Sequence, residues 1–393
     1  MSIPLQHPES PRWSRTAPDG ARLVTGFSPE FVPGGDFTLG AEDEALLVQR
    51  NGRLRTTGAV RLTTTLSHLP TTVGRVVPDV FANQVELNSV VCDGAESLHR
   101  SMRQLRAQAR AAGAWLMAVG THPAAEFGAI RTISNPRVNA IHEEFVGLLR
   151  APTSALQVHV GFPDAETAMT AYHGVRHQLP VLRALGASSP MWHGQDSGLV
   201  STRAAIMWSY PRVGIPPAVL DYEDYVHQAT TLMSAAEVPD ESYLWWDMRV
   251  QPHLGTLEVR VLDSQPSLEH AAGLAALIQG IARAAVERPL AEDLPSAVLS
   301  ENDFRAVRYG LDARIFDRGG VMRPMRLIAG EALTRARDAL RGDRLDAPLD
   351  VVAAMLWEPT EASRQRRIFR EKGLPALLRN LTQRTNDLGG DAG

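Results

Sequence analysis

The 393-residue chain contains a single cysteine, Cys92, and a single lysine, Lys372. One cysteine cannot form an intrachain disulfide framework or a cysteine-rich zinc site, so the expected compartment is the reducing cytoplasm. With one lysine, a Gly-Lys-Ser/Thr phosphate loop or a Schiff base would depend on Lys372 alone, and both are excluded. Because nearly all positive charge is arginine, any phosphate that the protein binds is expected to contact arginine side chains.

The sequence also lacks a concentrated basic segment and a long uninterrupted apolar segment. Its 44 acidic residues slightly outnumber its 40 basic ones, and nucleic-acid binding, which requires clustered positive charge, is not expected. The most apolar long stretch, residues 271–286, is interrupted by Gln279 and Arg283 and does not predict a membrane span. The N-terminal residues show no basic segment followed by an apolar one, so no secretory signal is expected.

Residues 1–36 are rich in proline and glycine and show no sustained periodicity, which predicts a flexible N-terminal extension. Residues 37–385 are predicted to form a single catalytic domain, and residues 386–393 a disordered tail. Helical spacing is clearest after Asp93, whose pairing with Glu96 resembles a capping box, and after Asp164. Further helices are predicted at residues 267–288, 301–311, 324–342, 348–357 and 360–384.

Alternation of apolar and polar residues predicts five strands, at residues 40–48, 84–88, 156–161, 245–249 and 256–261. One face of each strand is apolar, and the other carries side chains capable of chemistry: Glu42 and Glu44; Gln84, Glu86 and Asn88; Gln157 and His159; Asp247 and Arg249; Glu258 and Arg260. A solvent-exposed face of any single strand would show the same alternation. Five such faces together favour an α+β fold, with a concave antiparallel sheet whose inner face is polar and helices packed on its apolar back.

The polar faces would place several carboxylates in one cavity: Glu42, Glu44, Glu86, Glu258 and, at its margin, Asp247. Such a cluster repels itself, so bound cations are expected. Carboxylates with one imidazole suit Mg²⁺ or Mn²⁺ rather than zinc, and His159 is either the nitrogen ligand or a hydrogen-bonded strand histidine. Arg249 and Arg260 could contact phosphates or form ion pairs with glutamates. Metal ligands beside arginines point to nucleotide-dependent phosphoryl transfer.

Seven sequence blocks occur in a recognisable order: Gly40-Ala-Glu-Asp-Glu, Gln84-Val-Glu-Leu-Asn-Ser, Gly120-Thr-His-Pro123, Gln157-Val-His-Val-Gly161, Ser189-Pro-Met-Trp-His-Gly-Gln-Asp-Ser-Gly198, Trp246-Asp-Met-Arg249 and Gly255-Thr-Leu-Glu-Val-Arg260. Together they resemble the type 2 glutamate-cysteine ligase family, also called carboxylate-amine ligases, over residues 37–385. That family is similar in fold to glutamine synthetase, and guanidino kinases have a related catalytic fold. Each block alone is weak, but the ordered set is specific.

The resemblance implies an ATP-dependent ligase. A carboxylate, usually the γ-carboxylate of glutamate, attacks the γ-phosphate of ATP, and an amine then captures the acyl phosphate. It also implies Mg²⁺ or Mn²⁺, a homodimer, and small amino-acid and amine substrates. The implied metal ligands are Glu42, Glu44, Glu86, His159 and Glu258. Glu42, Glu258 and Arg260 would serve catalysis, with Arg260 facing the transferred phosphate. Arg203 and Arg249 would join Arg260 in binding ATP.

The sequence departs from the family pattern at positions that bear on substrate choice. Asp43 and Ala45 replace residues of the usual Gly-Val-Glu-Glu-Glu-Phe opening, but Asp43 is predicted to point away from the metal-binding face. Gln195, Leu199 and Val138 stand where the family has an arginine and two tyrosines. The candidate substrate contacts are Gln157, Asn88, Gln195 and Arg137. Two other functions stay open: a ligase-fold binding or regulatory subunit without catalysis, and a phosphotransferase that makes no amide.

Overall fold

The computed structural model describes residues 27–69, 72–126, 131–145, 151–289 and 294–388. A seven-stranded sheet forms its centre. Its strands are β1 (Leu39–Val48), β2 (Gly74–Pro78), β3 (Gln84–Ser89), β4 (Trp115–Met117), β5 (Ala155–Gly161), β8 (Met248–Gln251) and β9 (Thr256–Asp263). They follow the order β2-β3-β1-β5-β9-β8, with β4 paired to β1. Every pairing is antiparallel, which confirms the predicted sheet.

The alternation that predicts these strands is visible in the burial of β1. Ala41 and Asp43 are buried on one face, whereas Glu42 and Glu44 on the other are only partly buried, because successive side chains of a strand point to opposite faces. Four predicted strands coincide with β1, β3, β5 and β9. The fifth begins later than predicted, at Met248, and residues 245–247 precede it. The sequence missed β2 and β4, which are too short to show a period.

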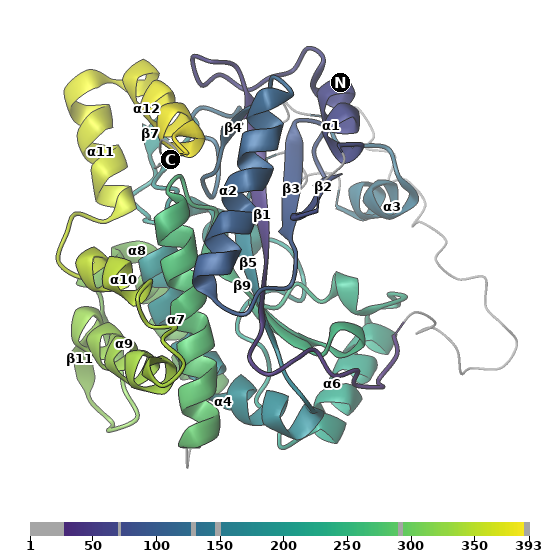
Figure 1. Ribbon diagram of the computed structural model, residues 1–393, viewed down its shortest axis with the longest axis vertical. Coiled ribbons are helices and arrows are strands. Elements are labelled where there is room, and N and C mark those ends of the chain that lie inside the picture. The colour runs from purple at the N-terminus through teal and green to yellow at the C-terminus, as the bar shows by residue number, and fades with distance from the viewer. Residues whose placement is uncertain (1–26, 70–71, 127–130, 146–150, 290–293, 389–393) are drawn as a thin grey trace, which may run out of the picture.

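Helices cover the apolar face of the sheet, as predicted. α2 (Ala95–Ala111), α4 (Ala165–Gly186) and α7 (Leu268–Glu287) contact β3, β9 and β5, respectively. α2 and α7 lie in front of the sheet in Figure 1. Around them and against β4 pack α8 (Ser296–Tyr309), α9 (Met325–Arg341), α10 (Leu349–Met355), α11 (Glu361–Lys372) and α12 (Leu374–Asn386). No helix within the described ranges combines the length and apolarity needed to cross a bilayer.

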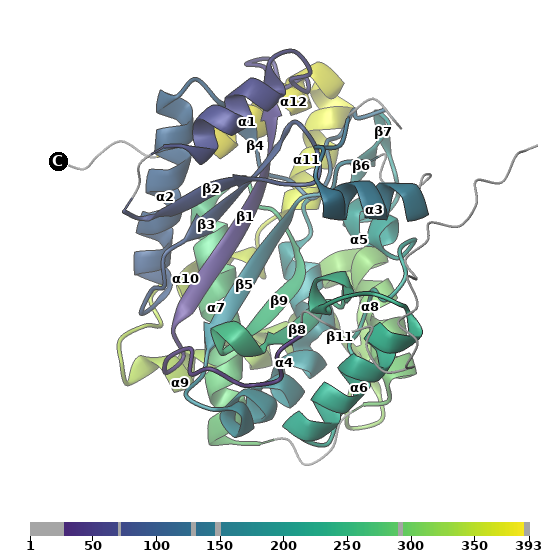
Figure 2. The same cartoon turned by 90° about the vertical axis from the view of Figure 1, so that its right-hand side faces the viewer.

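Shorter elements complete the fold around the sheet and its helices. Figure 2 shows α3 (Pro136–Glu144), α5 (Thr202–Met207) and α6 (Tyr222–Ala235) to the right of the sheet. α1 (Ala59–Ser67) packs on β2. Two small hairpins pair β6 (Met191–Trp192) with β7 (Gln195–Asp196), and β10 (Arg314–Phe316) with β11 (Met322–Pro324). Short 3₁₀ turns span Glu241–Tyr243, Pro252–Leu254 and Gly310–Asp312.

Local chemistry explains where several helices begin and end. Asp164 accepts a hydrogen bond from the backbone N–H of Thr167 and caps α4, as its sequence position predicts. The predicted capping role of Asp93 is wrong: Gly94 is the N-cap of α2, and Asp93 lies outside the helix. Gly373 adopts φ 75°, a left-handed conformation that suits glycine, and splits the predicted 360–384 helix into α11 and α12.

Near both ends of the chain, residues predicted to be flexible or disordered belong to the folded structure. Residues 27–36 belong to the packed structure, since Val32 N donates to Pro252 O at 2.9 Å and Gly34 N to Phe162 O at 2.8 Å. Near the C-terminus, Arg103 Nε donates to the carbonyl of Leu388 at 2.6 Å. The predictions of a flexible extension over residues 1–26 and a disordered tail over residues 389–393 lie outside the described residues.

Candidate active site

Strand register brings the polar residues into one surface. Across β3, β1 and β5 the opposed residues are Asn88, Glu42 and Gln157 in one row and Glu86 and Glu44 in the next. His159 of β5 lies opposite Glu258 of β9, and Glu258 lies opposite Arg249 of β8. Directly opposed residues project from the same face of a sheet. The five polar faces recognised in the sequence therefore form one continuous surface.

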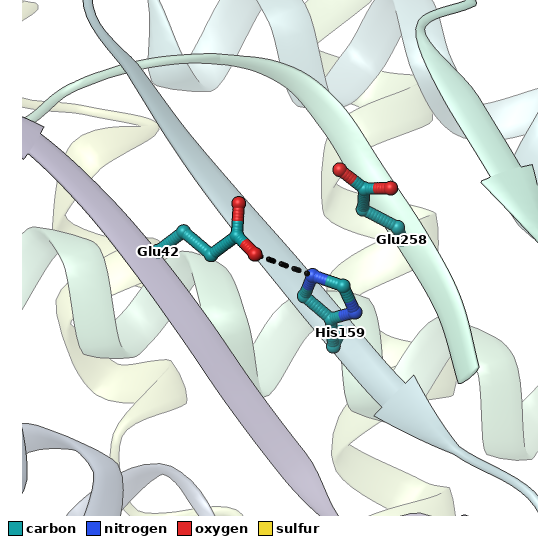
Figure 3. Close-up of side chains that lie close together, drawn as sticks. All are labelled: Glu42, His159 and Glu258. Carbon is teal, nitrogen blue, oxygen red and sulfur yellow. Dashed lines mark ion pairs between the residues drawn. The ribbon is translucent and has the colours of Figure 1, made fainter. Parts of the chain in front are cut away.

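Glu42, His159 and Glu258 form a compact donor cluster on this surface (Figure 3). One candidate ligand atom from each residue lies within 4.8 Å of the others. His159 Nε2 faces Glu42 Oε1 at 3.4 Å and has no hydrogen-bond partner in the described part of the chain. His159 Nδ1 lies 2.9 Å from Thr256 Oγ1, which fixes the ring orientation. Two carboxylates and one imidazole nitrogen suit Mg²⁺ or Mn²⁺.

Glu258 is the most strongly held anion of this cluster. It accepts hydrogen bonds from Arg249 Nε at 2.5 Å and from Gln251 Nε2 at 2.6 Å, and it also pairs with Arg260. Burial alone would raise the pKa of Glu258, but the Arg249 and Arg260 guanidiniums hold it well below its ordinary value. Glu258 is therefore ionised. A bound cation would compete with Arg260 for Glu258, and a bound phosphate would compete with Glu258 for Arg260.

A second group of carboxylates lines the neighbouring part of the sheet. Burial and the nearby Asp79 raise the pKa of Glu44 from 4.5 to about 8. Burial, followed by the charges of Glu42, Asp79 and Glu44, raises the pKa of Glu86 well above its usual value. Burial likewise raises the pKa of Asp79. Such shifts mark crowded carboxylates without enough positive charge nearby, a situation that bound cations relieve.

Asp79 is a site residue that the sequence reasoning missed. It directly follows β2, a strand too short to be recognised, and lines the same cavity as Glu44 and Glu86. The available signal was its position directly after the short segment Arg75-Val-Val-Pro78, seven residues before Glu86. The antiparallel turn between β2 and β3 returns the chain to the same end of the sheet and so brings Asp79 to the cluster.

Two cavities meet at the donor cluster, and Glu42 lines both. The first, which we call the site cavity, has a volume of about 250 Å³ and contains Glu44, Asp79 and Glu86. The second cavity, of about 330 Å³, contains His159 and Asn88. Its remaining lining comes largely from backbone and small residues, including Gly34, Gly40, Gly74 and Gly161. Molecules in the two cavities could therefore approach Glu42 from different sides.

Four arginines line the site cavity: Arg137, Arg203, Arg249 and Arg260. Arg203, at the start of α5, donates from Nη2 to the carbonyl of Arg260 at 3.1 Å. Arg137, at the start of α3, donates to the carbonyl of Ser242 at 3.0 Å and makes no ion pair with an acidic side chain of the described residues. Its guanidinium is thus available to a substrate carboxylate.

The remaining predicted residues lie elsewhere. Gln195 is exposed on β7 and is not among the described residues that line either cavity. Asp247, considered at the margin of the carboxylate cluster, instead pairs with Arg183 at 2.7 Å and takes no part in the donor cluster. Asp43 points to the opposite face, as predicted, and its Oδ2 pairs with buried Arg106 at 2.7 Å.

The Gly120-Thr-His-Pro123 block has a structural role. His122 is buried; its Nε2 lies 2.8 Å from the carbonyl of Gly52, and its Nδ1 accepts a hydrogen bond from Ala124 N at 3.1 Å. Burial lowers the pKa of His122 to about 4, so the ring is neutral near pH 7. His122 therefore joins the loop after β4 to the turn after β1.

Gly120 lets the buried Asp263 side chain approach the backbone close to the site. A Cβ at this position would lie 2.4 Å from the carboxyl carbon of Asp263. Asp263 accepts hydrogen bonds from Ser189 Oγ at 2.7 Å and Ser201 Oγ at 2.9 Å, and Ser201 caps α5. This network anchors the start of the helix that carries Arg203 into the site cavity.

Comparison with known proteins agrees with this arrangement. The model of "Glutamate-cysteine ligase family 2" matches residues 38–355. The chain belongs to this family. A provisionally named glutamate–cysteine ligase 2-1 of Rubrobacter xylanophilus is 33% identical over 86% of this chain and 91% of its own. A provisionally named glutamate–cysteine ligase 2 of Sorangium cellulosum is 32% identical over 90% of this chain and 97% of its own. Family membership identifies the protein as an amide-bond-forming ligase.

Solved structures share the fold at low sequence identity. The glutamate–cysteine ligase of Francisella tularensis in complex with AMP aligns with a TM-score of 0.69 at 12% identity, over 91% of this chain and 89% of that one. The complex between the ubiquitin-like protein Pup and its ligase PafA aligns with a TM-score of 0.54 at 12% identity, over 89% of this chain and 72% of that one. The sheet with helices on its apolar back is thus common to several ligases.

Proposed function

We propose that this family member is an ATP- and Mg²⁺-dependent ligase that joins a carboxylate to an amine through an acyl phosphate. The γ-carboxylate of glutamate is the leading candidate for the first substrate. The observation that carries the proposal is the position of the Glu42, His159 and Glu258 cluster where two cavities meet, with Arg260 beside it. A nucleotide and an amino acid could then meet at one phosphoryl-transfer point.

The donor set fits a hard divalent cation. His159 Nε2 is buried without a hydrogen-bond partner among the described residues, and the raised pKa of Glu44 and Glu86 means that their ionised forms have too little positive charge nearby. When bound, Mg²⁺ or Mn²⁺ would neutralise charge on the transferring phosphate. The residues proposed to hold the cations are Glu42, Glu44, Glu86, His159 and Glu258, together with Asp79.

The second cavity is suited to the nucleoside end of ATP. Gly40 contributes no side chain that would obstruct a flat ring, since a Cβ there would meet only His159 Cβ, at 3.7 Å. Val91 and Leu254 line the same cavity and are 74% and 47% exposed, so they offer apolar surface to cover a base. From there the phosphates would extend past His159 and Glu42 toward Arg260.

The site cavity is suited to the carboxylate substrate. In the first step, a carboxylate oxygen attacks the γ-phosphorus, the bond to the β–γ bridging oxygen breaks, and ADP leaves. In the second step, the amine nitrogen attacks the acyl carbon and loses a proton, while the carbon–oxygen bond to phosphate breaks and phosphate leaves. Arg203 and Arg260 would stabilise the negative oxygens that develop, and Arg137 would bind a second carboxylate of the substrate. No covalent bond to the protein is needed.

The test is ADP release by the purified full chain with ATP and Mg²⁺, across single amino acids and then pairs with amines, with products identified by mass. We expect ADP, phosphate and an amide in equal amounts, and loss of activity in Glu42→Gln. Glu301→Gln is the matched control, because the Glu301 side chain is 57% exposed and, among the described residues, forms an ion pair only with Arg305. A phosphorylated product without amide would favour the phosphotransferase, and ATP binding without turnover would favour the regulatory subunit.

A further inference from the structure

The lining of the site cavity has two chemically different parts. The sheet contributes carboxylates and amides through β1, β3 and β5. The elements outside the sheet contribute Asp79, Arg137 and Arg203 together with a group of apolar side chains, which we call the apolar wall: Phe81, Val138, Ile141, Met207, Tyr210 and Trp245. The charged groups of a substrate can bind the polar and charged residues of this cavity, but they would leave the apolar wall without a contact.

The apolar wall is a packed surface. Val138 and Ile141 lie three residues apart on α3, so they share one face of the helix, and they are 3% and 4% exposed. The Trp245 ring packs edge-on against Tyr210, with ring centroids 5.7 Å apart, and against Phe145 at 6.2 Å. These ring contacts hold Trp245 in place, so the wall is preformed before any substrate arrives.

Neither substrate of a glutamate–cysteine ligation would use this wall. Glutamate carries two carboxylates, one ammonium group and two methylenes, and Arg137, Glu44 and Asp79 provide partners for its charges. Cysteine adds only a thiol on one methylene. An apolar group of larger size would gain free energy by leaving water and packing on the wall. Val138, in place of the expected tyrosine, contributes no hydroxyl to the lining, and the accessible part of the wall comes from the partly buried Met207, Tyr210 and Trp245.

We propose that the amine substrate carries a bulky branched aliphatic or aromatic group, which packs against Met207, Tyr210 and Trp245. The amine nitrogen would then face the sheet, where the acyl phosphate forms. This assignment rests on the proposed ligase function and adds the chemical class of the acceptor to it.

The test compares acceptors with the purified full chain, ATP, Mg²⁺ and glutamate, or whichever acid supports amide formation. The acceptors are alanine, cysteine, leucine and phenylalanine, followed by ethylamine, isoamylamine and phenethylamine. We expect kcat/KM for the bulky member of each series to exceed that for the small member by at least about tenfold, since each added methylene in an apolar pocket contributes about 10- to 200-fold. A preference for alanine, cysteine or ethylamine would overturn the assignment.

Substitutions in the apolar wall test whether it causes the preference for bulky amines. Met207→Gln is close in shape and retains an acceptor for Thr153 Oγ1, which contacts the Met207 sulfur at 3.8 Å, but it places an amide in the apolar wall. We expect it to lower kcat/KM for bulky amines by about tenfold and to lower it much less for small amines, which reach less of the wall. Met322→Gln on β11, outside the site cavity, is the matched control. Should Met207→Gln fail to fold, Val138→Ala should shift the preference toward still larger amines.

The outcomes separate the two proposals. Amide formation without a size preference, or with the preference carried by the acid, refutes the assignment of the acceptor and leaves the ligase function standing. Absence of amide from every pair refutes both. An equal loss for small and bulky amines in Met207→Gln would mean that the wall supports the fold without selecting the acceptor.

Discussion

Replacing Glu86 by glutamine should stabilise the metal-free protein at alkaline pH. Burial and three neighbouring carboxylates raise the pKa of Glu86 well above its ordinary value. The folded state therefore binds this proton more tightly than the unfolded chain does. For such an acid, stability is present at low pH and is lost as pH rises above about 4.5. Glutamine does not titrate, so Glu86→Gln should escape this loss.

Burial and the charges of Glu42 and Asp79 raise the pKa of Glu86 more than Glu44 does, but the register allows the contribution of Glu44 to be sized. Glu86 lies directly opposite Glu44, so their Cβ atoms are about 5 Å apart, and we use this distance for the separation of the two charges. Two unit charges at this separation repel by about 3 kcal/mol at an effective dielectric constant of about 20. Because the pKa of Glu44 is itself raised to about 8, the neighbour is only partly ionised near that pH. Partial ionisation reduces this repulsion by about half or more, so Glu44 alone gives an expected gain in unfolding free energy of about 1 to 2 kcal/mol.

Urea unfolding with a chelator, at pH values between about 5 and 8, measures the difference between wild type and Glu86→Gln. The two proteins should be equally stable at the acid end and should diverge as pH rises. Mg²⁺ should stabilise the wild type more than the variant and so remove or reverse the difference. Equal destabilisation of the variant at every pH, or no response of the wild type to Mg²⁺, would refute the reasoning.

Three further substitutions probe the buried groups behind the site. Asp43→Asn should cost about 3 to 5 kcal/mol in urea unfolding, because it leaves buried Arg106 without its counter-charge; a loss below about 1 kcal/mol would contradict this. Gly120→Ala should cost about 1 to 3 kcal/mol, since the added Cβ meets Asp263 at 2.4 Å, and an unchanged melting temperature would count against it. His122 should make the wild type acid-sensitive: its pKa is lowered to about 4, so stability falls between about pH 6.5 and 4 by up to about 3 kcal/mol relative to His122→Gln. Parallel pH profiles would exclude that role.

The apolar and polar alternation of the strands could be read from the sequence because it is a local property. A strand turns its side chains by half a revolution per residue, so Glu42 and Glu44 must share a face wherever the strand lies. The same argument placed His159, Glu258 and Arg260 on polar faces and turned Asp43 toward the helices. Asp164 could be recognised as a helix cap because capping depends on residues within one turn.

Other parts of the site depend on contacts that no local pattern encodes. Asp79 and Arg137 enter the site cavity because the β2–β3 turn and α3 close over the sheet. The pairing of Asp247 with Arg183 depends on where α4 packs. Gln195 has a suitable side chain and a suitable block, yet β7 carries it to an exposed position. Such placements follow from packing between distant segments.

The sequence by itself therefore determined which side chains of each strand share a face and which chemistry they can perform, since strand period and residue type are local. Only the tertiary structure decided which strands are neighbours, how Glu42 comes to line two cavities, and why an apolar wall stands over an acidic sheet. These features arise from long-range packing, in which strand register and helix placement are settled by the burial of the whole core.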